Sequence, residues 1–284
     1  MAEHGTVTRA HAGPTADEIS LAETIGRDLR TVRVMWQREL IRLLRSPYGI
    51  LLSLLMPLLF LVVLGTGMNA TVAGGVDFRA YFLPGVILMA VQGPAVNTGI
   101  SIVWDRRSGF LREMLVAPVR RSALMTGICL GGATSATAYG AAVLATALLI
   151  GMTYQPARLV LVLMEMLVVT LAFTALGALA AVSVQRIEMF QAVVGTAMMP
   201  MVFLSGALFP VSVLPGPLNV LALLNPMTYA VDAIRRTLDD ATAGALPGPQ
   251  WAGWQPPVAL EVTLVGTVAM LAVVGAARRF SRVT

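Results

Sequence analysis

The chain has 284 residues, of which 57% are hydrophobic and only 12% are charged, and its formal net charge is +5. An ordinary soluble domain carries about a quarter charged residues, so this composition, with a mean hydropathy of +0.78, excludes a water-soluble protein. The apolar runs are continuous over about 20 residues, whereas the strands of a membrane β-barrel would alternate over about ten. We therefore predict an all-α integral membrane protein.

The inventory of reactive side chains argues against an enzyme. All 20 basic residues are Arg, so the chain has no lysine for a P-loop, a Schiff base or a kinase-type site. Both histidines, His4 and His11, lie in the polar N-terminal segment, and the single cysteine, Cys129, lies in an apolar run. These residues cannot build a zinc site, a Cys/His nucleophile pair or a disulfide. We expect no catalytic, metal or cofactor site on this chain.

The N-terminal part divides into two segments. Residues 1–19 are polar, which predicts a disordered cytoplasmic tail and not a signal peptide. Residues 20–47 place apolar side chains every three or four positions, which predicts an amphipathic helix in the membrane interface with its Arg side chains toward anionic lipid. The alternative is a soluble helix packed on another subunit. The apolar positions are Leu21, Ile25, Leu29, Val32, Trp36, Leu40 and Leu43.

Residues 48–280 are predicted to form one transmembrane domain, because six apolar runs are long enough to cross about 30 Å of hydrocarbon. With the N-terminus inside, the inner segments hold 16 Arg and the outer segments hold four. Basic residues accumulate on the cytoplasmic side of membrane proteins, so we predict a multi-pass protein of the cell membrane with both termini in the cytoplasm. The six spans lie near 49–68, 81–103, 123–151, 158–183, 189–209 and 258–277.

The segment 218–238 could form either a seventh span or a broken hairpin. It contains Pro226, Asp232, Arg235 and Arg236, all of which are costly in lipid. Its second half has apolar residues at helical spacing, and Asp232 lies three and four positions before the two arginines, which favours ion pairing. We predict a broken, partly inserted hairpin at the outer surface, covered by other parts of the protein.

The inner loop between the second and third spans, residues 104–122, is predicted to contain a short amphipathic helix that ends at Pro118. Such a helix in a cytoplasmic loop suits docking into a groove on a soluble partner. The alternative is that the arginines of the loop only set the orientation of the protein. The apolar face of the helix consists of Phe110, Leu111, Met114 and Leu115.

Two carboxylates and one stretch of small residues lie within or beside the spans. Glu165 lies inside the fourth span, where an ionisable residue indicates a transport path by default, and the alternative is a neutral or hydrogen-bonded structural residue. Glu261, at the outer end of the sixth span, is expected to lie simply at the interface. The stretch around Gly131 and Gly132 predicts close helix packing, with a dimer contact as the alternative.

Three further segments carry sequence motifs that are interpreted together. The first is RELIRLLRSP, residues 38–47, followed by Met56-Pro57, and the second is DRRSGFLREMLVAP, residues 105–118. The third runs from SGALFP, residues 205–210, to NPMTYAVDAIR, residues 225–235. Together they resemble the membrane subunit of a type-2 ABC exporter, the permease family that includes daunorubicin-resistance and nodulation-factor export proteins. The resemblance covers about residues 30–280, and Arg107-Ser108 stand where relatives often carry an acidic residue.

The resemblance implies an assembly of several subunits. Two permease subunits, identical or different, would lie in the lipid bilayer and pair with two ATP-binding cassette subunits, which would hold ATP and Mg²⁺. No nucleic acid would be bound. This chain would be the transmembrane subunit of an ATP-driven exporter that moves a hydrophobic drug, a lipid or a glycoconjugate out of the cell, as in antibiotic resistance.

The resemblance also implies roles for two groups of residues. An inner-loop helix would contact the ATPase and couple it to the membrane domain, and re-entrant helices would cap the pathway on the outer side. The residues that match the coupling helix are Arg107, Gly109, Phe110, Leu111, Arg112, Glu113, Met114, Leu115 and Pro118. Those that match the outer re-entrant hairpin are Phe209, Pro210, Asn225, Pro226, Tyr229, Asp232 and Arg235.

Two other classes of function are the alternatives. An ion-coupled drug carrier often has ten or more spans, internal repeats and buried charges along its path, whereas this chain has no clear repeat and only Glu165 deep in a span. A non-transporting membrane scaffold or assembly factor is the other alternative. A neighbouring gene for an ATPase would distinguish the ABC exporter from both.

Overall fold

The computed structural model describes residues 21–71, 77–107, 120–184, 186–238 and 248–282, and these residues are almost entirely helical. They contain no strand, and their one isolated bridge joins Trp251 to Trp254. The all-α fold is therefore confirmed. The helices are α1 (Leu21–Leu44), α2 (Pro47–Thr71), α3 (Phe78–Arg107), α5 (Arg121–Leu149), α6 (Pro156–Ser183), α7 (Ile187–Leu204), the short 3₁₀ helix η2 (Val211–Val213), α8 (Gly216–Leu224), α9 (Pro226–Leu238) and α11 (Val258–Arg282).

Six of these helices, namely α2, α3, α5, α6, α7 and α11, are long and apolar enough to cross a membrane, which confirms the expected number of spans. The segment that offered a seventh span is divided at Asn225 into α8, with nine residues, and α9, with 13 residues. Each is shorter than the roughly 20 residues that a spanning helix needs. The tail predicted over residues 1–19 lies outside the described residues.

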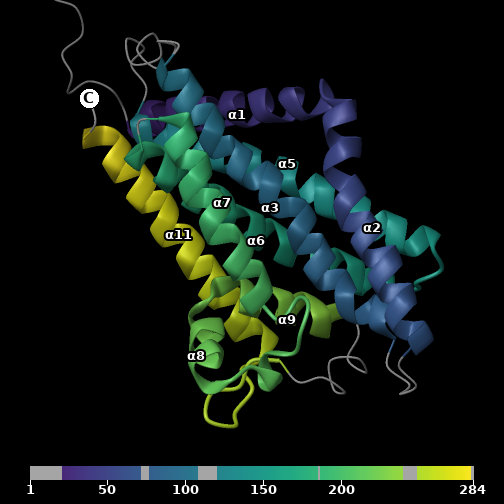
Figure 1. Ribbon diagram of the computed structural model, residues 1–284. Helices are drawn as coiled ribbons and strands as arrows, with labels where there is room; N and C mark the ends of the chain where they lie inside the picture. The colour runs from purple at the N-terminus through teal and green to yellow at the C-terminus, as the bar shows by residue number, and fades with distance from the viewer. Residues whose placement is uncertain (1–20, 72–76, 108–119, 185, 239–247, 283–284) are drawn as a thin grey trace, which may run out of the picture.

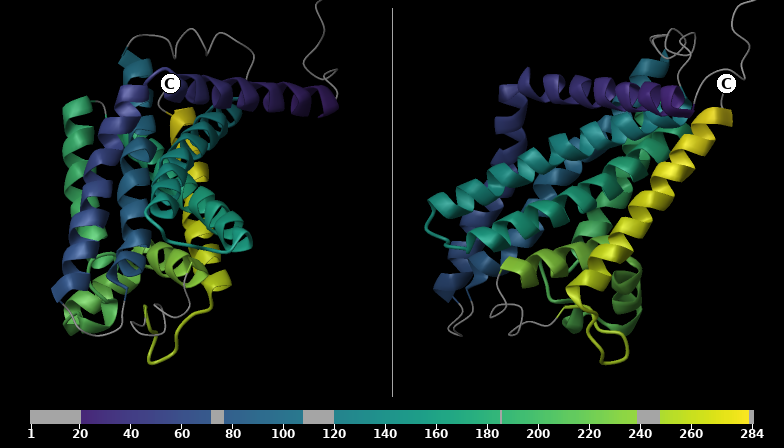
Figure 2. Two further views of the ribbon diagram at one scale, coloured as in Figure 1. Left: turned by 90° about the vertical axis from the view of Figure 1, so that its right-hand side faces the viewer. Right: turned by 180° about the vertical axis from the view of Figure 1, so that it is seen from behind.

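The spans run side by side between two different ends of the molecule (Figure 1). At one end α1 lies across the bundle, and the last residues of α3 and α11 and the first residues of α5 lie beside it, as both views in Figure 2 show. We call this the α1 end. At the opposite end, the α9 end, α8 and α9 fold beneath the spans (Figures 1 and 2).

Helix α1 is held at its place by close packing on α5. A Cβ atom on Gly131 would lie 2.8 Å from the Cβ of Glu39, and one on Gly127 would lie 2.9 Å from a backbone oxygen of α1. The Trp36 indole donates a hydrogen bond of 3.1 Å to the Thr134 hydroxyl. The small residues of α5 therefore allow α1 to approach within the chain, which confirms the prediction that they serve close packing.

The buried face of α1 is rotated from the apolar stripe that its sequence suggests. Met35 and Glu39 are buried, whereas Ile25 and Leu29 of the predicted stripe are exposed. Burial of a carboxylate at Glu39 instead of an apolar side chain is possible because Arg42, one turn later, pairs with it at 3.1 Å. The exposed apolar residues of α1 remain available for another surface.

The core lies around α3, which is the most buried of the spans. Its central residues, including Leu83, Ile87 and Val91, are fully or almost fully buried among α5, α6 and α9. Gly132 of α5 allows Thr98 of α3 to come close. By contrast, α2, α7 and α11 are the least buried spans. The exposed faces of these three spans surround a tightly packed centre. A functional surface is therefore expected on them.

Candidate functional site

Helix α9 joins several spans at the α9 end. It packs against α3, α6, α7 and α11. Four apolar side chains at helical spacing anchor it, and all four are buried, as the sequence predicts for this segment. An apolar face this regular supplies most of the helix stability through burial. The four residues are Met227, Val231, Ile234 and Leu238.

The turn into α9 is built by the polar residues of the predicted hairpin. The Asn225 carboxamide oxygen accepts a bond of 3.0 Å from the Met227 backbone N–H and caps α9, while its amide donates 2.7 Å to a carbonyl of α7. Pro226 occupies the first helical position, where a missing N–H costs nothing. The Asn-Pro pair therefore ends α8 and starts α9. Earlier in the hairpin, Pro210 precedes η2 and Phe209 is exposed.

Tyr229 fastens α9 to the segments on either side of it. Its hydroxyl donates to the Leu223 carbonyl oxygen at 2.7 Å and accepts from the Trp251 indole at 3.0 Å. Burial raises the pKa of this phenol, which keeps the donating proton on the oxygen. The ring also meets Trp251 edge to face, with centroids 6.1 Å apart. Tyr229 therefore has a structural role in holding α8 and the 251–254 turn together.

Arg235 points from α9 into α3. Its guanidinium donates a hydrogen bond of 2.7 Å to the Gly206 carbonyl oxygen and lies 4.2 Å from the centre of the Tyr81 ring. Gly206 has a φ of +78°, a left-handed conformation that glycine adopts without strain. Burial lowers the pKa of Arg235, whereas the neighbouring Tyr81 and Asp232 raise it. The cation–π contact with Tyr81 and the hydrogen bond to Gly206 together compensate for the hydration that the guanidinium loses on burial.

Arg236 joins α9 to α11 through two buried carboxylates. It lies 3.0 Å from Asp232 and 2.6 Å from Glu261, and these carboxylate residues are 2% and 0% exposed. Its guanidinium also donates 2.8 Å to the Pro256 carbonyl oxygen. The predicted pairing of Asp232 with Arg236 is confirmed. The expectation that Glu261 lies simply at the interface is wrong, because Arg236 provides a partner for it inside the protein.

Glu165 of α6 also contacts α9. The Thr237 hydroxyl donates a hydrogen bond of 2.6 Å to one oxygen of the carboxylate, and Glu165 is 9% exposed. Among the described residues the other oxygen is buried without a hydrogen-bond partner. The contact is of the kind expected for a structural carboxylate that reaches a neighbouring helix. It places Glu165 in the packing between α6 and α9.

Replacing Glu165 by glutamine is expected to change stability by less than about 1 kcal/mol, because the amide oxygen accepts the same bond from Thr237. Glu165→Leu removes the acceptor and is expected to cost about 1–3 kcal/mol. Heat stability can be followed through the thiol of Cys129, which is buried and reacts with a thiol dye only after unfolding. Equal losses in the two variants would show that the negative charge itself matters.

At the α1 end, two ion pairs flank the segment predicted to form the coupling helix. Asp105, just before it, pairs with Arg38 of α1 at 2.7 Å, and Arg120, just after it, pairs with Asp28 of α1 at 3.5 Å. The segment therefore leaves α3 and enters α5 beside the same helix. Arg107 is the last residue of α3, and its side chain is not described. The other predicted coupling residues, Gly109, Phe110, Leu111, Arg112, Glu113, Met114, Leu115 and Pro118, lie outside the described residues.

A shallow groove of about 260 Å³ runs between α3 and α7. Its walls are mostly apolar, with Val96, Ile100 and Met198 among them, and they contain no charged side chain. Three carboxamides, those of Gln92, Asn97 and Gln191, line it as well. Asn97 and Gln191 are exposed although both helices are candidate spans. A polar side chain exposed to hydrocarbon is costly, so a protein or water-filled neighbour would stabilise this face.

Several of these contacts were not predicted in the sequence analysis, although most of their residues were named there. The pairing of Arg236 with Glu261 joins residues 25 positions apart, and the Arg235 contact with Tyr81 joins residues even further apart. One rule would have found the first pair. Arg236 and Glu261 both lie at the outer ends of predicted segments, and charges near a membrane are expected to pair with one another.

The chain was compared with models of known protein families. The model described as ABC-2 type transporter matches residues 30–238. The match begins within α1 and ends at the last residue of α9, so it includes five of the six candidate spans and all of α8 and α9. The chain matches no curated protein.

Proposed function

The chain belongs to the ABC-2 type transporter family as a multi-pass membrane permease subunit, and on this premise we propose that it exports a hydrophobic drug or a lipid. Membership in a transport family argues against both alternatives, an ion-coupled carrier and a membrane scaffold. Subunits of this kind transport and do not catalyse. The energy would come from a separate ATP-binding cassette subunit that holds ATP and Mg²⁺.

The proposed partner ATPase is supported by the family of the chain, and the composition agrees with it. A P-loop uses a lysine on the β- and γ-phosphates, and this chain has none. In our proposal the partner docks on the 107–118 segment. The ion pairs of Asp105 and Arg120 with α1 would then transmit its movement to α1, α3 and α5 together.

The α3–α7 groove is the observation that carries the proposed substrate class. Its apolar walls suit an apolar molecule, and its three neutral carboxamides supply directional hydrogen bonds without a charge. A strongly charged substrate would meet no counter-ion there. A hydrophobic drug or lipid therefore fits better than a glycoconjugate, which is the second choice.

The same groove supports a second permease subunit. Asn97 and Gln191 would be exposed to lipid in a lone chain, and a second copy or a related permease placed on the α2–α7 side would cover them. We propose that the two subunits enclose the path between them. Glu165 belongs to the packing of α9 in this arrangement and does not line the path.

We further propose that the α1 end faces the cytoplasm of the cell membrane, with α1 in the interface. The basis is the 16-to-four division of Arg residues. Reporter fusions after Asp77, Gly109, Gly244 and the C-terminus are expected to read outside, inside, outside and inside. A C-terminal fusion that is active only outside would contradict this orientation.

Purified alone, the chain is expected to hydrolyse no ATP above the level of a mock preparation. With its ATPase partner in lipid nanodiscs, hydrolysis is expected to appear and to rise with an apolar transported compound. A partner with a replaced P-loop lysine is the control. Gln191→Leu should change which compounds stimulate hydrolysis, whereas Met199→Leu, on α7 but outside the groove, should not. Hydrolysis by the chain alone, or identical compound profiles for both variants, would contradict the proposal.

A further inference from the structure

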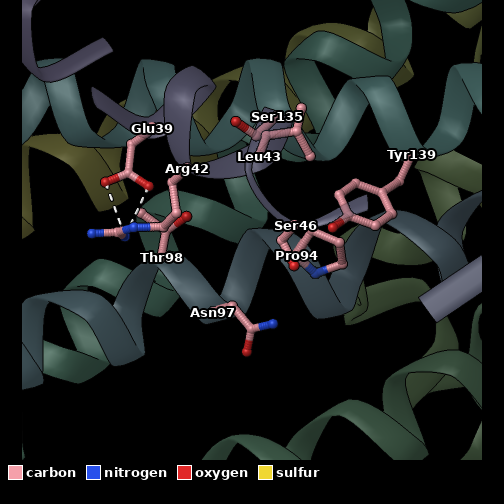
Figure 3. A pocket seen from close by; sticks show the side chains of 9 residues that line it. All are labelled: Glu39, Arg42, Leu43, Ser46, Pro94, Asn97, Thr98, Ser135 and Tyr139. Carbon is pink, nitrogen blue, oxygen red and sulfur yellow. Dashed lines mark hydrogen bonds and ion pairs between the residues drawn. The ribbon is translucent and has the colours of Figure 1, made fainter. Parts of the chain in front are cut away.

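A second cavity, of about 200 Å³, lies in the corner where α1 turns into α2. It is far larger than the space that one water molecule needs. Figure 3 shows its walls, with Glu39 and Arg42 of α1 facing each other and Tyr139 of α5 projecting toward Ser46 and Pro94. The remaining lining residues are Leu43 after Arg42, Asn97 and Thr98 of α3, and Ser135 of α5.

One carboxylate and one guanidinium line this cavity side by side. Nη1 of Arg42 donates to both oxygens of Glu39, at 3.2 and 3.1 Å. A guanidinium has five N–H groups, and each carboxylate oxygen can accept a second bond, so both groups keep unused hydrogen-bonding capacity. The Arg42 side chain is 45% exposed, whereas that of Glu39 is 6% exposed. Burial raises the pKa of Glu39, and the nearby Arg42 and Arg38 act against this.

The rest of the wall is neutral and polar. Ser46, Thr98 and Tyr139 contribute hydroxyl groups, and Asn97 contributes a carboxamide. The Ser135 hydroxyl is buried and has no hydrogen-bond partner among the described residues.

We propose that this cavity binds the zwitterionic head group of a phospholipid that carries a primary ammonium, with the phosphate on Arg42 and the ammonium on Glu39. A head group with only negative charge would meet Glu39, and one with only positive charge would meet Arg42. The neighbouring Arg38 does not change this balance, because Asp105 pairs with it at 2.7 Å.

The position of the cavity favours a lipid over a soluble compound. Directly after it, the first turns of α2 expose Leu51, Leu52 and Leu55, which offer an apolar surface to acyl chains. The assignment of the ligand to a lipid rests on the proposed placement of α1 in the membrane interface. It does not rest on the transported substrate or on the ATPase, so binding and export can fail independently.

The test is native mass spectrometry of the full-length chain purified in detergent. It is incubated with phosphatidylethanolamine or with phosphatidylglycerol of the same acyl chains, and the retained lipid is counted. The chain is expected to retain phosphatidylethanolamine at least tenfold more. Arg42→Gln and Glu39→Gln should each reduce retention about tenfold. Arg45→Gln, in the turn directly after α1 and outside this cavity, should not.

Ser135→Leu provides a variant that leaves the charges in place. The added volume should fill the cavity and reduce retention as strongly as Arg42→Gln, and the thiol assay on Cys129 checks that each variant is folded. Equal retention of the two lipids, an Arg45→Gln effect as large as that of Arg42→Gln, or no effect of Ser135→Leu in a folded protein would each overturn the proposal. Tighter binding of soluble O-phosphoethanolamine than of the lipid would overturn the assignment to a lipid.

Discussion

Arg236→Ala is expected to destabilise the protein by about 3–5 kcal/mol, the largest stability effect among the substitutions considered. The arginine lies between Asp232 and Glu261, at 3.0 and 2.6 Å, and both carboxylates are buried. Removing one partner of a buried ion pair leaves an uncompensated charge, which costs far more than the pair itself contributes. Here two carboxylates would lose the same partner, and α9 would lose its ion pair with α11.

The measurement is thermal unfolding in detergent, followed by the reaction of Cys129 with a thiol dye. This residue is the only cysteine of the chain and is fully buried in α5, so its reaction reports loss of the packed state. Arg186→Ala, at an exposed arginine, is the matched control and should change little. Adding Glu261→Gln to Arg236→Ala should recover part of the loss, because one buried charge is then removed. A loss no greater than in the control would contradict the buried network.

Leu111→Asp is expected to abolish association with the ATPase subunit. In our proposal the helix predicted around this residue would present Phe110, Leu111, Met114 and Leu115 to the cytoplasm, and docking would bury them. Each large side chain that is fully buried contributes about 1.5–3 kcal/mol. An aspartate in the same position would be buried without a partner. The loss should therefore exceed the contribution of the leucine alone.

Co-purification of the two subunits is the measurement. Arg112→Ala should weaken the association less, since charges at the edge of an interface mainly steer and orient the partners. Both variants should still insert in the membrane, because enough arginines remain in the loop to set orientation. If Leu111→Asp co-purified normally and Arg112→Ala did not, the contact would be electrostatic and not apolar. Asp105→Asn removes the ion pair with Arg38. A loss of association intermediate between those of Leu111→Asp and Arg112→Ala would support a role for this ion pair.

Much of the fold was predictable because the relevant information is local along the chain. The length of each apolar run determines whether it can span a membrane, and all six candidates are present. Asn225 followed by Pro226 is typical of a capping residue and a first helical position, so a new helix starting at Pro226 was predictable as well. The spacing of Met227, Val231, Ile234 and Leu238 identified the buried face of α9.

The partners of the buried charges were not predictable in the same way. Asp232 pairs with Arg236, which lies one turn away on the same helix. Glu261, however, required α11 to pack on α9, and Glu165 required α6 to present it to Thr237. Arg235, adjacent in sequence to Arg236, turns to Tyr81 because it lies on another side of α9.

The sequence by itself determined that this is a membrane protein with six spans, that it contains no lysine and that its arginines are distributed unequally among the segments between the spans. Composition and periodicity are sufficient for these conclusions, since each depends on residues close together in the chain. Only the tertiary structure decided which charges pair between different helices and which face of α1 is buried. Those outcomes depend on how whole helices rotate and approach one another. For example, Gly131 of α5 allows Glu39 of α1 to come close. The residue pattern of one helix does not specify which helix packs against it.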